Sequence, residues 1–129
     1  MASSDTRIRL GAHGERLASS HLVRAGYRIL ERNARCGRTG EIDIVARDSR
    51  CIVFCEVKTR VAGTTAGPAG PLDAIGTAKR RRLRRLAAEW LRTRPLDARR
   101  PDWIRFDAIG VTVDRTGALL SLDHVEDAF

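Results

Sequence analysis

Residues 40–47 read GEIDIVAR and residues 51–58 read CIVFCEVK, and these two stretches decide the fold of this chain. In both of them the side chains alternate in character with a period of two, which is the signature of a β-strand. The residues between them, 48–50, read DSR, which is typical of a tight turn. The pattern therefore predicts a β-hairpin.

A two-residue loop at Ser49-Arg50 would fix the register of this hairpin. The pairs that follow are Arg47–Ile52, Ile44–Cys55, Asp43–Glu56 and Ile42–Val57. The second and fourth pairs would form one uniformly apolar face, and a slip of one residue would destroy that match. We therefore expect Asp43 to lie opposite Glu56.

Directly opposed residues have Cβ atoms roughly 4.5–5.5 Å apart. Two carboxylates at that distance repel each other and raise one pKa unless a cation lies between them. Lys58 follows Glu56 by two residues, on the same face and opposite Glu41. Oxygen ligands of this kind suit Mg²⁺ or Mn²⁺, which can hold a scissile phosphate and lower the pKa of a bound water. The ordinary alternative is a solvated hairpin face with Glu41–Lys58 and Asp43–Lys58 ion pairs, and spacing alone does not separate the two.

Asp43, with Glu56-Val57-Lys58 on the next strand, resembles the PD-(D/E)xK signature of nucleases, with Ile42 at the proline position. More closely, about residues 8–127 resemble the YraN-like family of small bacterial proteins, which is similar to archaeal Holliday-junction resolvases. The stretches that carry this resemblance are GAHGE (11–15) with Ala18, GYRILERN (26–33), GEIDIV (40–45), FCEVKTR (54–60), KRRRL (79–83) and RFD (105–107). The resemblance implies a restriction-endonuclease-like fold and an active site at these acids, but it does not establish a substrate.

Helical spacing of apolar residues predicts a first helix from about Arg9 to Ala25, with residues 1–7 disordered. Glu15 lies beside the apolar stripe of this helix. In the nucleases that the chain resembles, a glutamate on this helix completes the metal site, which makes Glu15 a third acidic candidate. The alternative is an ordinary solvated glutamate near a helix start.

The remaining pattern predicts a strand at 27–33, a mobile Gly/Pro-rich loop at 60–72, a helix from about Leu72 to Arg94, and strands at 102–113 and 118–125. The order is α-β-β-β-α-β-β, a single α/β domain of one mixed sheet flanked by helices. We expect the loop to be a flap that orders over nucleic acid, because it leaves the chain directly after Lys58.

The composition favours a nucleic-acid partner. The formal net charge is +8 with a pI of about 10.8, which attracts polyanions. Of the 24 basic residues only Lys58 and Lys79 are lysines, so the arginine bias weakens the inference from any single arginine. It also draws attention to the two lysines, because guanidinium replaces a compact point charge poorly. The expected phosphate-binding residues are Arg32, Arg35, Arg38, Arg60, Lys79, Arg81, Arg82 and Arg85.

Other classes of protein fit less well. The chain starts without an apolar run of signal-peptide length and has no segment that would cross a bilayer, so we expect a cytoplasmic protein. Its three cysteines suit a reducing compartment, and Cys51 and Cys55 are roughly 13 Å apart along a strand, too far to share a zinc ion.

These observations predict a nuclease that depends on Mg²⁺ or Mn²⁺ and acts on nucleic acid, with branched or structured DNA as the expected substrate. Asp43, Glu56, the Val57 carbonyl and Glu15 would hold the metal, and Lys58 would assist the attacking water. Cutting two strands of a junction needs two sites, which is a reason to expect a homodimer, although no motif indicates one. The alternative is a non-catalytic nucleic-acid-binding module on a nuclease fold.

Overall fold

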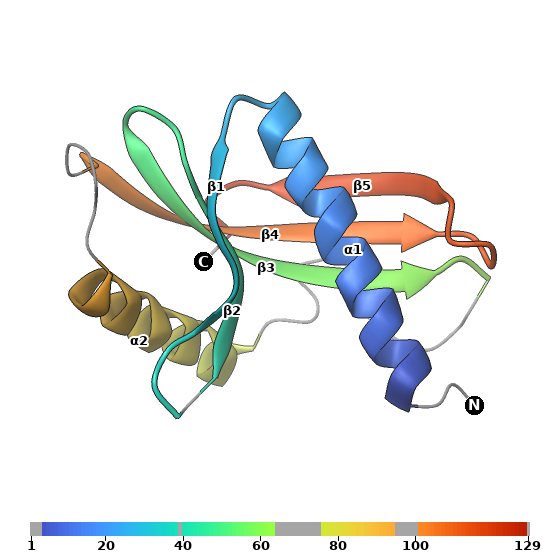
Figure 1. Cartoon of the computed structure of the whole chain (residues 1–129), viewed down its shortest axis with the longest axis horizontal. Coiled ribbons are helices and arrows are strands. Elements are labelled where there is room, and N and C mark those ends of the chain that lie inside the picture. The colour runs from blue at the N-terminus through green and yellow to red at the C-terminus, as the bar shows by residue number, and fades with distance from the viewer. Residues whose placement is uncertain (1–3, 39, 64–75, 95–100, 129) are drawn as a thin grey trace.

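The computed structural model describes residues 4–38, 40–63, 76–94 and 101–128. The elements are α1 (Ser4–Arg24), β1 (Arg28–Arg35), β2 (Glu41–Arg47), β3 (Cys51–Val61), α2 (Thr77–Thr93), β4 (Trp103–Val113) and β5 (Leu119–Val125). This is the predicted order, and the predicted mixed sheet with a helix on either side is confirmed (Figure 1).

The five strands form one sheet in the order β1-β2-β3-β4-β5. Strand β3 pairs in parallel with β4, and the other three pairings are antiparallel. The parallel pair needs a long crossover connection, and α2 lies within that connection. Figure 1 shows α1 crossing the long strands β3 and β4, while α2 lies at the other end of the sheet, near β2.

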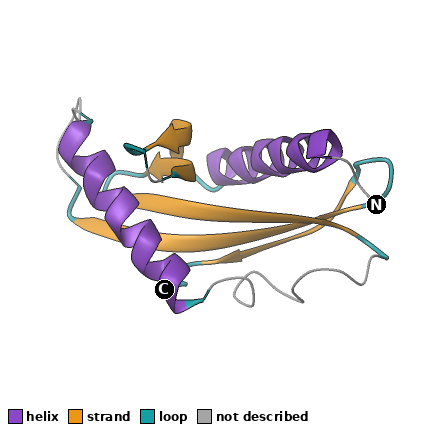
Figure 2. Cartoon of the chain, turned by 90° about the horizontal axis from the view of Figure 1, so that it is seen from below, coloured by secondary structure: helices purple, strands orange, loops and turns teal. Residues whose placement is uncertain are grey.

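The two faces of the hairpin β2–β3 are both buried, each under a different helix. Ile44, Val53 and Cys55 pack in a cluster with Ala18 and Leu22 of α1. The alternate positions pack against α2, in a cluster that includes Val45, Ile52, Phe54, Leu83, Leu86 and Trp90. Figure 2 shows one helix along one side of the long strands and the other helix crossing the opposite end of the sheet. Because both faces are covered, these strands are nearly continuous runs of apolar residues.

The first helix begins earlier than its apolar stripe indicated. It starts at Ser4, so the prediction of disorder is wrong for residues 4–7. Asp5 lies in the first turn, where a negative charge interacts favourably with the helix dipole. None of the described helices is long and apolar enough to cross a membrane.

The second helix begins at Thr77, after Gly76 as its N-cap. The expected start of this helix near Leu72 lies outside the described residues. Trp90 is buried and meets Phe54 edge to face in the core. Of the loop expected at 60–72, Arg60 and Val61 belong to β3, and residues 64–72 are not among the described ones.

Candidate functional site

The register of the hairpin is the predicted one over the length that is paired. Arg47 lies opposite Ile52, and Ile44 lies opposite Cys55. This last pair leaves Asp43 and Glu56 as the next two residues on their strands. The carboxylate of Asp43 does not point into solvent, because its Oδ2 accepts a hydrogen bond of 2.7 Å from the backbone N–H of Val57.

One expectation about this end of the hairpin is wrong. Ile42 and Val57 do not share an apolar face, because Ile42 packs in the cluster under α2 and Val57 in the cluster under α1. The pairing of β2 with β3 ends at Ile44–Cys55, and beyond it an oxygen of the Asp43 side chain accepts a hydrogen bond from the Val57 N–H. The two strands therefore diverge where the acids lie.

Burial and a neighbouring negative charge act together on Asp43. Removal from water is the largest cause that raises its pKa, the charge of Glu56 is the second, and the pKa reaches about 7. The Val57 N–H and the ammonium of Lys58 favour the charged form but do not outweigh these effects. A cation between the two carboxylates would remove this penalty.

Glu15 reaches the same place from α1. A Cβ on Gly14 would clash with the side chain of Thr59 on β3, so the bare backbone of Gly14 lets α1 lie directly on the strand beside Lys58. Burial raises the pKa of Glu15, and so do the charges of Glu41 and Glu56, against a hydrogen bond from Asn33. The charge of Glu15 also raises the pKa of Asp43, so the three acids interact electrostatically.

Both lysines of the chain form ion pairs with one carboxylate, that of Glu56. Lys79 Nζ of α2 is 2.7 Å from Glu56 Oε1, and Lys58 Nζ is 3.6 Å from the same oxygen. Glu56 is only 14% exposed. Burial alone would lower the pKa of Lys79, but its hydrogen bond to Glu56 gives a net rise. Contact with Lys79 is the largest cause of the lowered pKa of Lys58. In the alternative of a solvated hairpin face Glu41 would pair with Lys58, but in the structure Glu41 pairs with Arg35, at 3.4 Å.

The donors in this cluster fit one kind of metal. Within the described part of the chain, no three acidic, histidine or cysteine side chains form a ready-made metal centre. Mg²⁺ is commonly bound by only one or two protein carboxylates, together with waters and substrate phosphates. The oxygen atoms of Asp43 and Glu56 match that preference. The carbonyl group of Val57 points to the same side of β3 as its own N–H, which donates a hydrogen bond to Asp43.

The arginines named from the sequence lie in different positions. The exposed arginines of β1 and the turn after it are Arg32, Arg35 and Arg38. Those of α2 are Arg81, Arg82 and Arg85. Arg60 is also exposed, and its Nε lies 3.3 Å from Thr112 Oγ1. Arg32 also acts on Glu15, whose pKa it lowers. The guanidinium of Arg82 lies so close to Gly40 that a Cβ there would clash with it.

Sequence reasoning missed two features near the acids. It assigned Lys79 to phosphate binding and gave no sign of its contact with Glu56, because 23 residues separate the two. It also overlooked Asn33, which adopts a left-handed backbone with φ of 51° and bonds Glu15. Asparagine is among the few residues that tolerate this conformation, which was the available signal.

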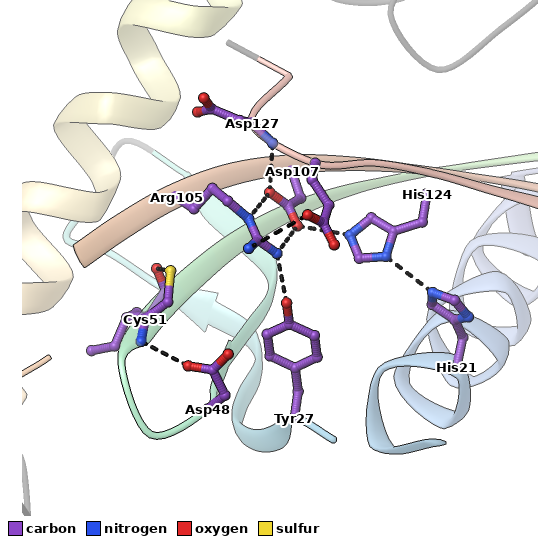
Figure 3. A network of polar contacts seen from close by, with 10 residues as sticks. His21, Tyr27, Asp48, Cys51, Arg105, Asp107, His124 and Asp127 are labelled. Carbon is purple, nitrogen blue, oxygen red and sulfur yellow. Dashed lines mark hydrogen bonds and ion pairs between the residues drawn. The ribbon is translucent and has the colours of Figure 1, made fainter. Parts of the chain in front are cut away.

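A second polar cluster surrounds the fully buried Asp107 on β4, which pairs with Cys55 of β3 (Figure 3). Arg105 donates two hydrogen bonds of 2.8 Å to its carboxylate, and His124 Nε2 lies 2.7 Å from Oδ2. His21 Nε2 lies 3.0 Å from His124 Nδ1, which ties α1 to β5. Arg105 is the charge partner of Asp107 within β4, and a carboxylate whose hydrogen bonds are satisfied in this way is that of a structural residue.

Comparisons with known proteins agree with the resemblance carried by the motifs. The model of the "Uncharacterised protein family UPF0102" matches residues 14–111. A UPF0102 protein of Streptomyces coelicolor is 46% identical over 117 residues, covering 91% of this chain and 86% of that protein. One from Geobacter metallireducens is 47% identical over 121 residues, covering 93% of this chain and 91% of its own. The chain belongs to the uncharacterised protein family UPF0102.

Proposed function

We propose that this protein is a metal-dependent nuclease that hydrolyses phosphodiester bonds in DNA. The observation that carries the proposal is the half-buried carboxylate of Asp43, held on the Val57 N–H beside Glu56, with a pKa raised to about 7. Acids placed so that they repel each other away from water cost stability, and such sites are enriched at functional centres. A cation that bridges them is the simplest reason for the arrangement.

The contacts of each side chain suggest its role. Asp43 and Glu56 would hold a divalent ion with the Val57 carbonyl, and Glu15 would ligate or orient from α1. When bound, such an ion would supply Lewis-acid stabilisation and a water of lowered pKa. Lys58 lies beside Glu56 and would orient the attacking water or neutralise charge that develops on the phosphate.

The basic residues around the acids support a polyanionic substrate. Exposed arginines of β1, its following turn and α2 would hold phosphates on either side of the cleaved one. The resemblance to PD-(D/E)xK nucleases and archaeal Holliday-junction resolvases favours branched or structured DNA, handled in the cytoplasm during recombination or repair. Two protein copies would then be needed to cut both strands of a junction.

A cleavage assay on several substrates tests the proposal. Branched, duplex and single-stranded DNA are incubated with the protein and Mg²⁺ or Mn²⁺, beside Asp43→Asn and Lys58→Ala variants. Asp123→Asn, which changes an exposed acid on β5, is the matched control for the loss of one carboxylate. We expect cleavage by the wild type and the control, and a loss of at least about 100-fold in both site variants. Cleavage that survives both site substitutions would refute the assigned centre.

A non-catalytic nucleic-acid-binding module is the second candidate. The contact of both lysines with Glu56 favours it, because these cations already neutralise the carboxylate that a metal would need. This candidate predicts binding of nucleic acid without cleavage on every substrate and with either metal. The same assay therefore separates the two functions.

A further inference from the structure

Lys79 and Glu56 form the shortest ion pair at the acid cluster, and they come from different elements. Lys79 is in the first turn of α2, and Glu56 lies on β3, 23 positions earlier in the chain. Their separation is 2.7 Å, against 3.6 Å for Lys58, the other lysine on the same oxygen. The carboxylate that is best placed to share a metal with Asp43 is therefore already held by an ammonium group.

The choice of residue at position 79 supports a role beyond bracing the helix. Only two of the 24 lysine and arginine residues are lysines, and both form ion pairs with Glu56. Arginine grips a carboxylate through a planar fork, whereas lysine is a compact charge on a flexible stem. Lysine can swing away from a carboxylate while its stem stays in place, and Lys79 is 37% exposed, so it has room to do so.

Formal charges at the cluster point the same way. When ionised, Glu15, Asp43 and Glu56 carry three negative charges, and Lys58 and Lys79 carry two positive ones. One divalent ion would turn this excess of one negative charge into an excess of one positive charge. That surplus matches the single negative charge of a phosphodiester, provided that both lysines remain at the site.

We infer that Lys79 is a positioning residue that occupies Glu56 as a resident cation, and that a divalent ion displaces it from this carboxylate. The inference rests on the proposed metal site. Displacement moves the ammonium off Glu56 but leaves it beside the acids, where the phosphate of a bound nucleic acid would lie. Lys79 thereby sets how strongly the site binds its metal.

Titration of the whole protein with Mn²⁺ at pH 8, by calorimetry and without nucleic acid, tests the inference. Lys79→Met removes the competing cation and keeps most of the apolar stem. We expect it to bind Mn²⁺ about tenfold more tightly than the wild type, because the variant lacks a positive charge that would repel the ion from a few ångströms away. Lys79→Arg keeps a cation on Glu56 that grips the carboxylate through its planar fork, so we expect it to bind Mn²⁺ about threefold or more weakly than the wild type.

Two controls separate competition from other effects. Arg80→Met removes an equal charge from the next, exposed residue of α2, and we expect its Mn²⁺ affinity to stay within about twofold of the wild type. Thermal unfolding of each variant shows that the fold is kept. Tightening in Arg80→Met equal to that in Lys79→Met, or equal affinities of Lys79→Met and the wild type, would overturn the inference.

The same titration distinguishes this inference from the nuclease proposal, which is read from cleavage alone. Mn²⁺ binding by Lys79→Met where the wild type binds none would support the resident-cation role. Failure of both proteins to bind Mn²⁺ would overturn it. A protein that shows the tenfold difference and cleaves no substrate would keep the role of Lys79 and lose the nuclease.

Discussion

The carboxylate of Asp43 accepts a hydrogen bond of 2.7 Å from the backbone N–H of Val57, just beyond Ile44 and Cys55, the last paired residues of strands β2 and β3. A side-chain oxygen thus satisfies a main-chain donor where the strands separate. The same bond holds a carboxylate beside Glu56, at a place where burial raises its pKa to about 7. The geometry that completes the backbone hydrogen bonding also creates the electrostatic strain.

This strain should be measurable as a dependence of stability on pH. The folded-state pKa of Asp43 lies above its unfolded value of 3.8, so the folded state loses stability as pH rises from about 4 to about 7. Asp43→Asn keeps an oxygen acceptor for Val57 and removes the charge. Without metal at pH 8, we expect the variant to be roughly 2–4 kcal/mol more stable in urea unfolding.

The difference in stability between Asp43→Asn and the wild type should shrink towards zero near pH 4, because residue 43 is then uncharged in the folded state of both proteins. Addition of Mn²⁺ at pH 8 should raise the unfolding temperature of the wild type more than that of the variant, because only the wild type keeps both carboxylates. An Asp43→Asn protein that is less stable than the wild type at pH 8 would contradict this account.

The packing of Gly14 on Thr59 gives a prediction with an internal control. Alanine at position 14 would clash with the Thr59 side chain, and we expect Gly14→Ala to lose about 1–3 kcal/mol of unfolding free energy. Gly11 is in the same helix and has open space around it, so Gly11→Ala should gain about 0.5–1 kcal/mol from helix propensity. Similar changes in the two variants would show that α1 does not need this close approach.

Nucleic-acid binding through α2 should appear in the salt dependence of affinity. Arg81 and Arg85 are both exposed on this helix. If each contacts a phosphate, the double change to alanine should reduce the slope of log Kd against log salt by about 2. Arg24 and Arg115, which are exposed elsewhere, provide a control pair of equal charge. An equal reduction in the control pair would mean that net charge, not α2, determines binding.

The elements and the hairpin register could be predicted because they follow from local patterns. Alternation in residues 42–47 and 53–58, with a short turn between them, admits one register that keeps the apolar residues together. The limits of that reasoning appear at Ile42. A period of two assigns it to the same face as Ile44, but the strand separates from β3 at Asp43, and Ile42 packs under the other helix.

Contacts between distant residues were beyond local patterns. Lys79 looked like one more cation on a basic helix, because nothing in the sequence reports which way the first turn of α2 faces. Glu15 was identified from a resemblance, and its approach to the acids depends on the absence of a single methyl group at Gly14. The partner of Asp107, in contrast, follows from a local pattern. An acid in the centre of a strand predicts a charge partner, and Arg105 lies two residues away on the same face.

The Asp107 cluster should determine much of the stability of the sheet edge. Asp107 is fully buried, and its carboxylate meets Arg105, His124 and the N–H of Asp127. Asp107→Asn would leave the guanidinium of Arg105 without its closest charge partner, at an expected cost of about 3–5 kcal/mol in urea unfolding. Asp123→Asn, an exposed change on the same pair of strands, should cost less than about 0.5 kcal/mol. Equal costs would contradict a structural role for Asp107.

His21 should make the contact between α1 and β5 sensitive to acid. Burial, then the nearby charges of His124 and Arg24, lowers its pKa below the ordinary value of 6.5. The folded state therefore favours the neutral ring, and this contribution to stability is complete above about pH 6.5 and lost as pH falls through the lowered pKa. Glutamine at position 21 can still donate to His124 but does not titrate. Between pH 7 and pH 5 the urea midpoint of the wild type should fall more steeply than that of His21→Gln. Parallel curves for the two proteins would show that His21 does not couple protonation to folding.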